Sequence, residues 1–145
     1  VENKISGMTD YSGQDDIEDF VIEANWILAY TAFGEQNYAE LEKYLSVEGV
    51  QGLHPWGIYL MTVGHRVMQS PTEVMEQDLS MLVMVCGNQN LSQSEKGDVC
   101  VMIGDLISEG YGGKSGLTAD MARDYYMDAV YCGNEYAKEM INGMG

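Results

Sequence analysis

The stretch 97–141 constrains the fold of this chain more than any other part of the sequence. Apolar residues recur in its first part at intervals of three and four, the spacing that places side chains on one side of an α-helix. Glycines interrupt the pattern at 110–113, and a second helical pattern ends at Gly133, where a left-handed C-terminal cap favours glycine. The apolar positions are Val99, Met102, Ile103, Leu106 and Ile107, then Ala122, Tyr125, Tyr126, Ala129 and Val130. The stretch is therefore predicted to form a helical hairpin.

The residues of this hairpin follow a recognisable order: a glycine late in the first helix, a glycine-rich loop, an aspartate opening the second helix, then Ala, a Tyr pair, Ala and Gly. The positions are Ile103, Gly104, Gly110 to Gly113, Asp120, Ala122, Tyr125, Tyr126, Ala129 and Gly133, with Ala137 in the following helix. This order resembles the Sel-one-like repeat, a relative of the tetratricopeptide repeat. Cys100, Val101 and a longer loop at 114–117 depart from that family's pattern.

A weaker copy of the hairpin precedes it in the chain. Residues 78–89 match residues 124–135 at Asp, Met, Cys, Gly and Asn, and Val63-Gly64 matches Ile103-Gly104. Two repeats are therefore predicted, at 55–89 and 95–133. Ser70-Pro71-Thr72-Glu73 reads as a capping box inside the first, and Ser92-Gln93-Ser94-Glu95 offers a similar helix start before the second.

The first third of the chain is predicted to be a divergent hairpin at 14–48, after a flexible lead-in at 1–13. Its first helix starts near Asp15 and ends at Gly34. The apolar stripe of this helix consists of Ile17, Phe20, Val21, Ala24, Leu28 and Ala32.

Together these segments predict an all-α chain of about seven helices, three hairpins plus a terminal helix at 134–143. Because no single hairpin can bury its own apolar face, neighbouring hairpins must stack. The expected architecture is a short right-handed α/α superhelix, or α-solenoid, forming a single domain over 14–145.

The charge of the chain limits its partners. Seven Lys and Arg against 23 Asp and Glu leave a formal net charge of −16. This charge argues against direct binding of nucleic acid or an anionic membrane, and it favours solubility or a basic protein partner. No run of about 18 apolar residues occurs, so no membrane span is predicted.

Two groups of residues are candidates for partner binding. Acidic residues are dense at the start of the first helix, and a field of that kind steers a basic partner. Tyrosine is favoured at interfaces because it combines a large contact area with a polar tip. The candidates are Asp15, Asp16, Glu18 and Asp19, together with Tyr30, Tyr38, Tyr111 and Tyr131.

The cysteines leave two alternatives open. The resemblance implies a disulfide between Cys86 and Cys100, at the two places that are bridged in cysteine-rich, secreted members of the family. On the loop-entropy model a closed loop of about 15 residues stabilises by roughly 3 kcal/mol. The alternative is that both are small buried thiols, and the odd Cys132 favours it. The expected location is periplasmic or secreted, with a cytoplasmic location as the alternative.

No catalytic residue, metal ligand or cofactor is predicted. His54 and His65 are the only histidines, and no HExxH, CxxC or two-histidine spacing occurs. Both are interpreted as surface or loop residues. The run 110–113 lacks the phosphate-loop pattern and follows a predicted helix instead of a strand.

Three function classes follow. The resemblance implies a non-catalytic protein–protein interaction module, because Sel-one-like proteins are mostly scaffolds and adaptors, and small bacterial ones include immunity proteins that neutralise secreted effectors. The first alternative is an acidic mimic of nucleic acid that inhibits a basic enzyme. The second is an enzyme, for which no nucleophile, base and orienting group can be named. The sequence leaves the partner's identity and the oligomeric state open.

Overall fold

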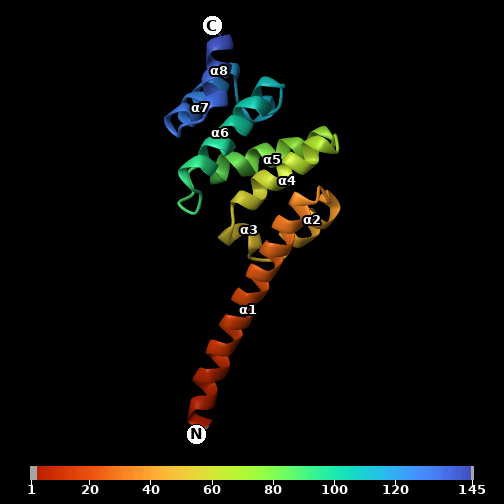
Figure 1. The fold of residues 1–145 in the computed structure, drawn as a ribbon, viewed down its shortest axis with the longest axis vertical. Helices are drawn as coiled ribbons and strands as arrows, with labels where there is room; N and C mark the ends of the chain where they lie inside the picture. Colours follow the sequence, from red (N-terminus) through yellow and green to blue (C-terminus); the bar gives the residue numbers. More distant parts are fainter. Residues whose placement is uncertain (1–2, 145) are drawn as a thin grey trace. The chain divides into compact units, whose positions relative to one another are not determined.

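The structure is a computed structural model that describes the backbone of residues 3–144 and the side chains of residues 17–144. Within these residues the chain forms eight α-helices, one short 3-10 helix and connecting turns, with no β-strand (Figure 1). The predicted all-α class is confirmed. The chain divides into two compact units, unit 1 at Val1–Leu53 and unit 2 at His54–Gly145, where the sequence predicts a single domain.

Unit 1 contains one long helix, one short helix and a single helical turn. They are α1 (Asn3–Gly34), α2 (Tyr38–Leu45) and α3 (Val50–Leu53). Helix α1 packs against α2 and α3. The side chain of Asn37 caps α2 by accepting a hydrogen bond from the backbone N–H of Glu40, at 3.3 Å. The short α3 is not predicted from the sequence, and it makes eight helices where about seven are expected.

Helix α1 begins twelve residues before Asp15, the predicted start. The predicted lead-in, residues 1–13, therefore coincides with α1 from Asn3 onward. The sequence did not indicate this extension because residues 3–13 show no apolar period. The side chains of Asp15 and Asp16 lie outside the described residues, and flexibility of the lead-in stays a prediction.

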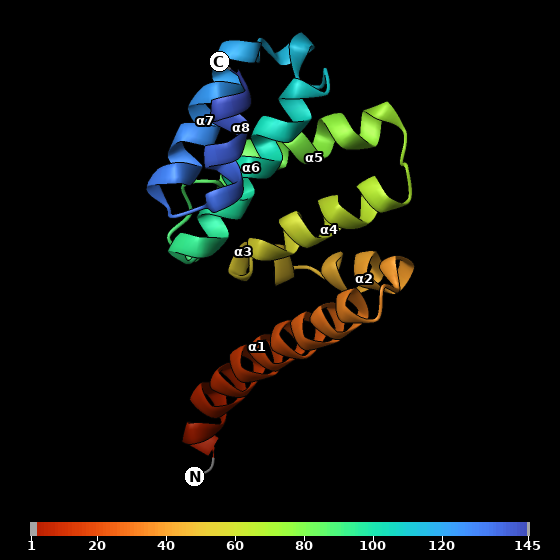
Figure 2. The same ribbon diagram turned by 45° about the horizontal axis from the view of Figure 1, so that its top comes forward.

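Unit 2 consists of two helical hairpins and a terminal helix. Helices α4 and α5 form the first hairpin, α6 and α7 form the second, and α8 packs along α7 (Figure 2). The bounds are α4 (Trp56–Val67), α5 (Thr72–Val85), α6 (Gln93–Ser108), α7 (Ala119–Tyr131) and α8 (Glu135–Met144), with η1 (Gly113–Ser115) in the turn before α7. The first hairpin falls within the predicted segment 55–89, the second begins two residues before the predicted 95–133, and α8 ends one residue beyond the predicted 134–143. The assignment of the two hairpins as repeats stays a prediction. The right-handed superhelix stays a prediction.

The local helix signals in unit 2 are partly confirmed. The Ser92 hydroxyl accepts from the backbone N–H of Glu95 at 3.1 Å, and the Glu95 carboxylate accepts from the backbone N–H of Ser92 at 2.9 Å, which completes a capping box. Gly133 has the expected positive φ, 91°. The capping box at Ser70 is wrong: Pro71 is the extended residue that precedes α5, so Ser70 lies one position too early.

The core of unit 2 is tightest where α6 meets α7. A Cβ on Gly104 would lie 2.7 to 3.0 Å from three ring atoms of Tyr126, so only glycine allows this approach. Tyr126 is fully buried, together with Val99, Ile103, Leu106, Ala122 and Ala129. This contact explains why the sequence pairs Gly104 with the second of two tyrosines.

Candidate protein-binding groove on helix α1

Helix α1 has apolar side chains on two sides. One side includes Ala29 and Ala32, which are buried, and Ile22, Trp26 and Phe33, which are half-buried. The opposite side includes Ile17, Phe20 and Leu28, whose exposed fractions are 64%, 73% and 45%. Val21 on this side is also exposed, and Ala24 is half-buried.

The exposed side is the stripe that the sequence predicts. At 100° per residue, Ile17, Val21, Ala24 and Leu28 fall within a narrow sector of the helix. Only Ala32 of the predicted stripe is buried. The periodicity therefore identifies a real apolar face, but this face is not covered in the structure. We call Ile17, Phe20, Val21 and Leu28 the α1 stripe.

A groove opens beside the N-terminal half of the α1 stripe. Its volume is about 470 Å³, and it lies between α1 and the turn that joins α2 to α3. The lining residues are Ile17, Glu18, Val21, Ile22, Val47, Glu48 and Gly49. All of them belong to unit 1. Four apolar side chains therefore line the groove together with two carboxylates.

Gly49 allows the turn after α2 to approach α1 closely. Its φ is +91°, a conformation that side chains other than glycine rarely adopt. A Cβ at this position would also lie 2.7 Å from the Cδ1 of Ile22. The turn thus approaches α1 closely enough to define one wall of the groove, and a larger residue at Gly49 would displace it.

The groove lies in an acidic region. Glu18 and Glu48 are both exposed at the groove, and Asp19 and Glu23 are exposed on other sides of α1. The sequence has no Lys or Arg between residues 5 and 42. Apolar surface and negative charge therefore occur together here without a basic residue on the same helix face.

The structure places the predicted partner-binding residues in different environments. Glu18 lies in the groove, whereas Asp19 is exposed on α1 and does not line the groove. Tyr30 is exposed on α1 and contacts Trp26 edge to face, with ring centroids 5.7 Å apart. Tyr38 is half-buried against Phe33 at 6.3 Å between centroids.

The remaining two tyrosines belong to unit 2. Tyr131 is exposed at the end of α7. Tyr111 is half-buried and lines a separate cavity of about 270 Å³ together with His65, Arg66 and Glu109. Tyr111 and Tyr131 therefore do not share the α1 groove. Sequence reasoning missed Val47 and Gly49, for which the signal was a glycine in the short link after α2.

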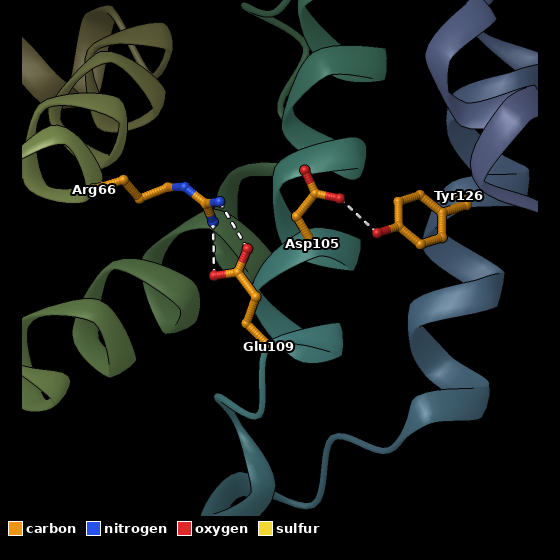
Figure 3. A network of polar contacts seen from close by, with 4 residues as sticks. All are labelled: Arg66, Asp105, Glu109 and Tyr126. Carbon is orange, nitrogen blue, oxygen red and sulfur yellow. Dashed lines mark hydrogen bonds and ion pairs between the residues drawn. The ribbon is translucent and has the colours of Figure 1, made fainter. Parts of the chain in front are cut away.

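Polar contacts in unit 2 join its helices (Figure 3). Arg66 of α4 donates to both carboxylate oxygens of Glu109 after α6, at 3.2 and 2.7 Å. The Tyr126 hydroxyl donates to Asp105 at 2.5 Å. Burial raises the pKa of Asp105 above its ordinary value, although the Tyr126 hydrogen bond and Arg66 act in the opposite direction. These contacts connect α4 to the end of α6, and α6 to α7.

The interpretation of His65 as a surface or loop residue is wrong. His65 lies within α4, and its Nδ1 is 2.6 Å from the Oδ2 of Asp78 on α5, with 12% of the His65 side chain exposed. The packing of α4 against α5 brings these residues together although they are thirteen positions apart in sequence. Across residues with described side chains, no group of three or more His, Cys, Asp or Glu is arranged to hold a metal ion.

The three cysteines are free in the structure. Burial raises the pKa of the Cys100 thiol to about 12, and the nearby Cys86 and Asp128 act in the same direction. The Cys86 thiol donates to the backbone carbonyl of Val83 at 3.2 Å. The Cys86–Cys100 disulfide is therefore not formed in this structure, and its formation under oxidising conditions stays a prediction.

Comparison with known proteins adds no relative. No protein-family model matches the chain, and no match is found among curated proteins or solved structures. Among the helices with described residues, none is long and apolar enough to cross a membrane. The resemblance to the Sel-one-like repeat therefore rests on the sequence pattern alone.

Proposed function

We propose that the chain is a protein–protein interaction module that binds its partner through the α1 stripe. The observation that carries this proposal is the exposure of Phe20, Ile17 and Leu28 on one side of α1. Isolated apolar residues are common on protein surfaces, but a continuous apolar stripe is typical of an interaction site.

The acidic surroundings favour a protein over other apolar surfaces. An anionic membrane would be repelled by Glu18, Asp19 and Glu23, which lie on the same helix as the stripe. Nucleic acid would be repelled for the same reason. A protein surface with basic residues around an apolar centre matches both the apolar stripe and the negative charge of α1.

The resemblance supports a narrower proposal, in which the chain is an immunity or adaptor protein that neutralises a secreted effector. It also supports a periplasmic or secreted location. The immunity role rests on the family pattern and on the net charge of −16, and the location rests on the family pattern alone. The exposed α1 stripe supports this narrower proposal, because it offers an apolar surface to an effector.

The proposal is tested by comparing three tagged full-length chains as baits in lysate of the source organism. The first is unchanged, the second carries Phe20→Ser and Leu28→Ser, and the third carries Met84→Ser as a control. Met84 is also apolar and is 82% exposed, but it lies on α5 of unit 2. Circular dichroism checks that all three baits are folded.

We expect a stoichiometric partner that the unchanged and Met84→Ser baits capture and the double variant loses. The purified partner is then titrated against each chain, with a loss of tenfold or more expected for the double variant. Equal capture by all three baits would contradict binding through the α1 stripe. Partners that are all lost at high salt, whichever bait is used, would favour the acidic mimic of nucleic acid.

A further inference from the structure

We infer that the ligand of the α1 groove is a cationic amphipathic helix, with Lys or Arg beside the apolar side chains that enter the groove. This inference rests on the proposed function and adds the chemistry and geometry of the partner. Three features of unit 1 carry it: the length of the stripe, the shape of the groove and the position of the carboxylates.

The α1 stripe extends over several turns of one helix, as a helical partner requires. Ile17 and Leu28 are eleven residues apart on one helix, which corresponds to about 16 Å or three turns. A second helix lying along this line would contact it through apolar residues at positions i, i+3 or i+4, and i+7. An extended peptide that binds by strand addition would instead need an open sheet edge, and the described residues contain no strand.

The groove provides an anchoring position next to the stripe. Ile17 and Val21 belong both to the stripe and to the groove, and Val47 lines the groove from the turn after α2. A volume of about 470 Å³ is sufficient for a bulky apolar side chain to enter. The partner helix is thus expected to insert one such side chain between α1 and the turn.

The carboxylates specify the charge of that helix. Glu18 comes from α1 and Glu48 from the turn, so negative groups from two elements line the groove. Lys and Arg side chains keep their stems on apolar surface while their charged ends reach such groups. Charge complementarity of this kind fixes the choice of partner and its register.

The same charges disfavour a second copy of this chain. Pairing two α1 helices through their stripes would place the groove carboxylates Glu18 and Glu48 of each copy at an interface between two acidic surfaces. The sequence has no Lys or Arg between residues 5 and 42 that would compensate these negative charges. A cationic partner gains attraction from the groups that would cause repulsion in a homodimer.

The test uses two synthetic helical peptides with the same leucine face, one with Lys and one with Glu at all other positions. A length of about 18 residues is sufficient for an isolated helix. Binding to the full-length chain is measured by titration calorimetry at 0.15 M salt, a typical physiological ionic strength. Four proteins are compared: the unchanged chain, Ile17→Ser with Val21→Ser, Glu18→Gln with Glu48→Gln, and Asp124→Asn with Glu139→Gln. The last variant removes two exposed negative charges from unit 2.

We expect the Leu–Lys peptide to bind the unchanged chain and the Leu–Glu peptide not to bind it. The Glu18→Gln, Glu48→Gln variant should bind the Leu–Lys peptide about fivefold more weakly than the unchanged chain does. The Ile17→Ser, Val21→Ser variant should lose about tenfold or more in affinity. The unit 2 charge variant should bind as the unchanged chain does.

Equal weakening by both charge variants would overturn the inference, because it would show attraction to net charge alone. Binding of both peptides alike, no binding of either, or self-association of the chain through the stripe in sedimentation equilibrium would also overturn it. The proposed function fails separately, when the Phe20→Ser, Leu28→Ser bait still captures the natural partner.

Discussion

Helices α1 and α6 have similar apolar patterns but opposite environments. In α6, Ile103, Leu106 and Val99 are completely buried. In α1, Ile17 and Phe20 are mostly exposed, although they repeat at the same helical spacing. The difference shows that periodicity tells which residues share a side of a helix, but not whether the chain supplies a surface to cover that side.

The reason lies in the elements that surround each helix. Within unit 2, α6 packs against α4, α5 and α7. Within unit 1, α1 has 32 residues, whereas α2 has 8 and α3 has 4. Two short elements can cover only one side of part of such a helix. The other side of α1 is therefore left uncovered within unit 1.

Substituting one isoleucine in α6 and one in α1 should show most strongly that α6 is buried and the α1 stripe is exposed. Ile103→Ala removes fully buried side-chain atoms from α6 and should lower the free energy of unfolding by about 2 to 5 kcal/mol. Ile17→Ala changes an exposed side chain and should change it by about 0.5 kcal/mol or less. Urea denaturation followed by circular dichroism measures both. Similar losses would show that Ile17 is buried in solution.

The glycine contact between α6 and α7 should have the next largest effect. In Gly104→Ala the new methyl group would meet the fully buried ring of Tyr126, and we expect a loss of about 1 to 3 kcal/mol in the free energy of unfolding. Gly113→Ala is the control, because a Cβ there has no atom within 4 Å. An unchanged urea midpoint for Gly104→Ala would contradict the close packing of these helices.

The titration of Asp105 should give a smaller difference in the free energy of unfolding. Its pKa is raised in the folded state, so folding favours the protonated form, and the group's contribution to stability falls as pH rises from the unfolded pKa through the folded one. Asp105→Asn removes this dependence. We expect the stability of the unchanged chain to decrease relative to Asp105→Asn between about pH 4 and the folded pKa. Parallel urea midpoints at every pH would contradict this environment for Asp105.

Signals confined to a few neighbouring residues predict much of unit 2. The spacing of Val99, Ile103 and Leu106 identifies α6, and Ser92 with Glu95 identifies its start. These signals work because helix periodicity and capping are local properties.

Features that depend on distant residues could not be predicted. The pairing of His65 with Asp78 requires two helices to pack in a particular register. The groove requires the turn at Val47 and Gly49 to meet Ile17 and Val21 of α1, which are about 30 residues away in the sequence. The acidic residue Glu18 was recognised from charge density, but its position beside an apolar groove depends on this packing.

The account depends most directly on the exposure of the α1 stripe, and the chain's two phenylalanines provide an internal comparison. Phe20 and Phe33 lie on the same helix, with Phe20 73% exposed and Phe33 half-buried. Hydroxyl-radical footprinting of the free full-length chain should oxidise Phe20 several times faster than Phe33, and the Leu–Lys peptide should protect Phe20 selectively. Equal or slower oxidation of Phe20 in the free chain would contradict the account, because the stripe would then already be covered.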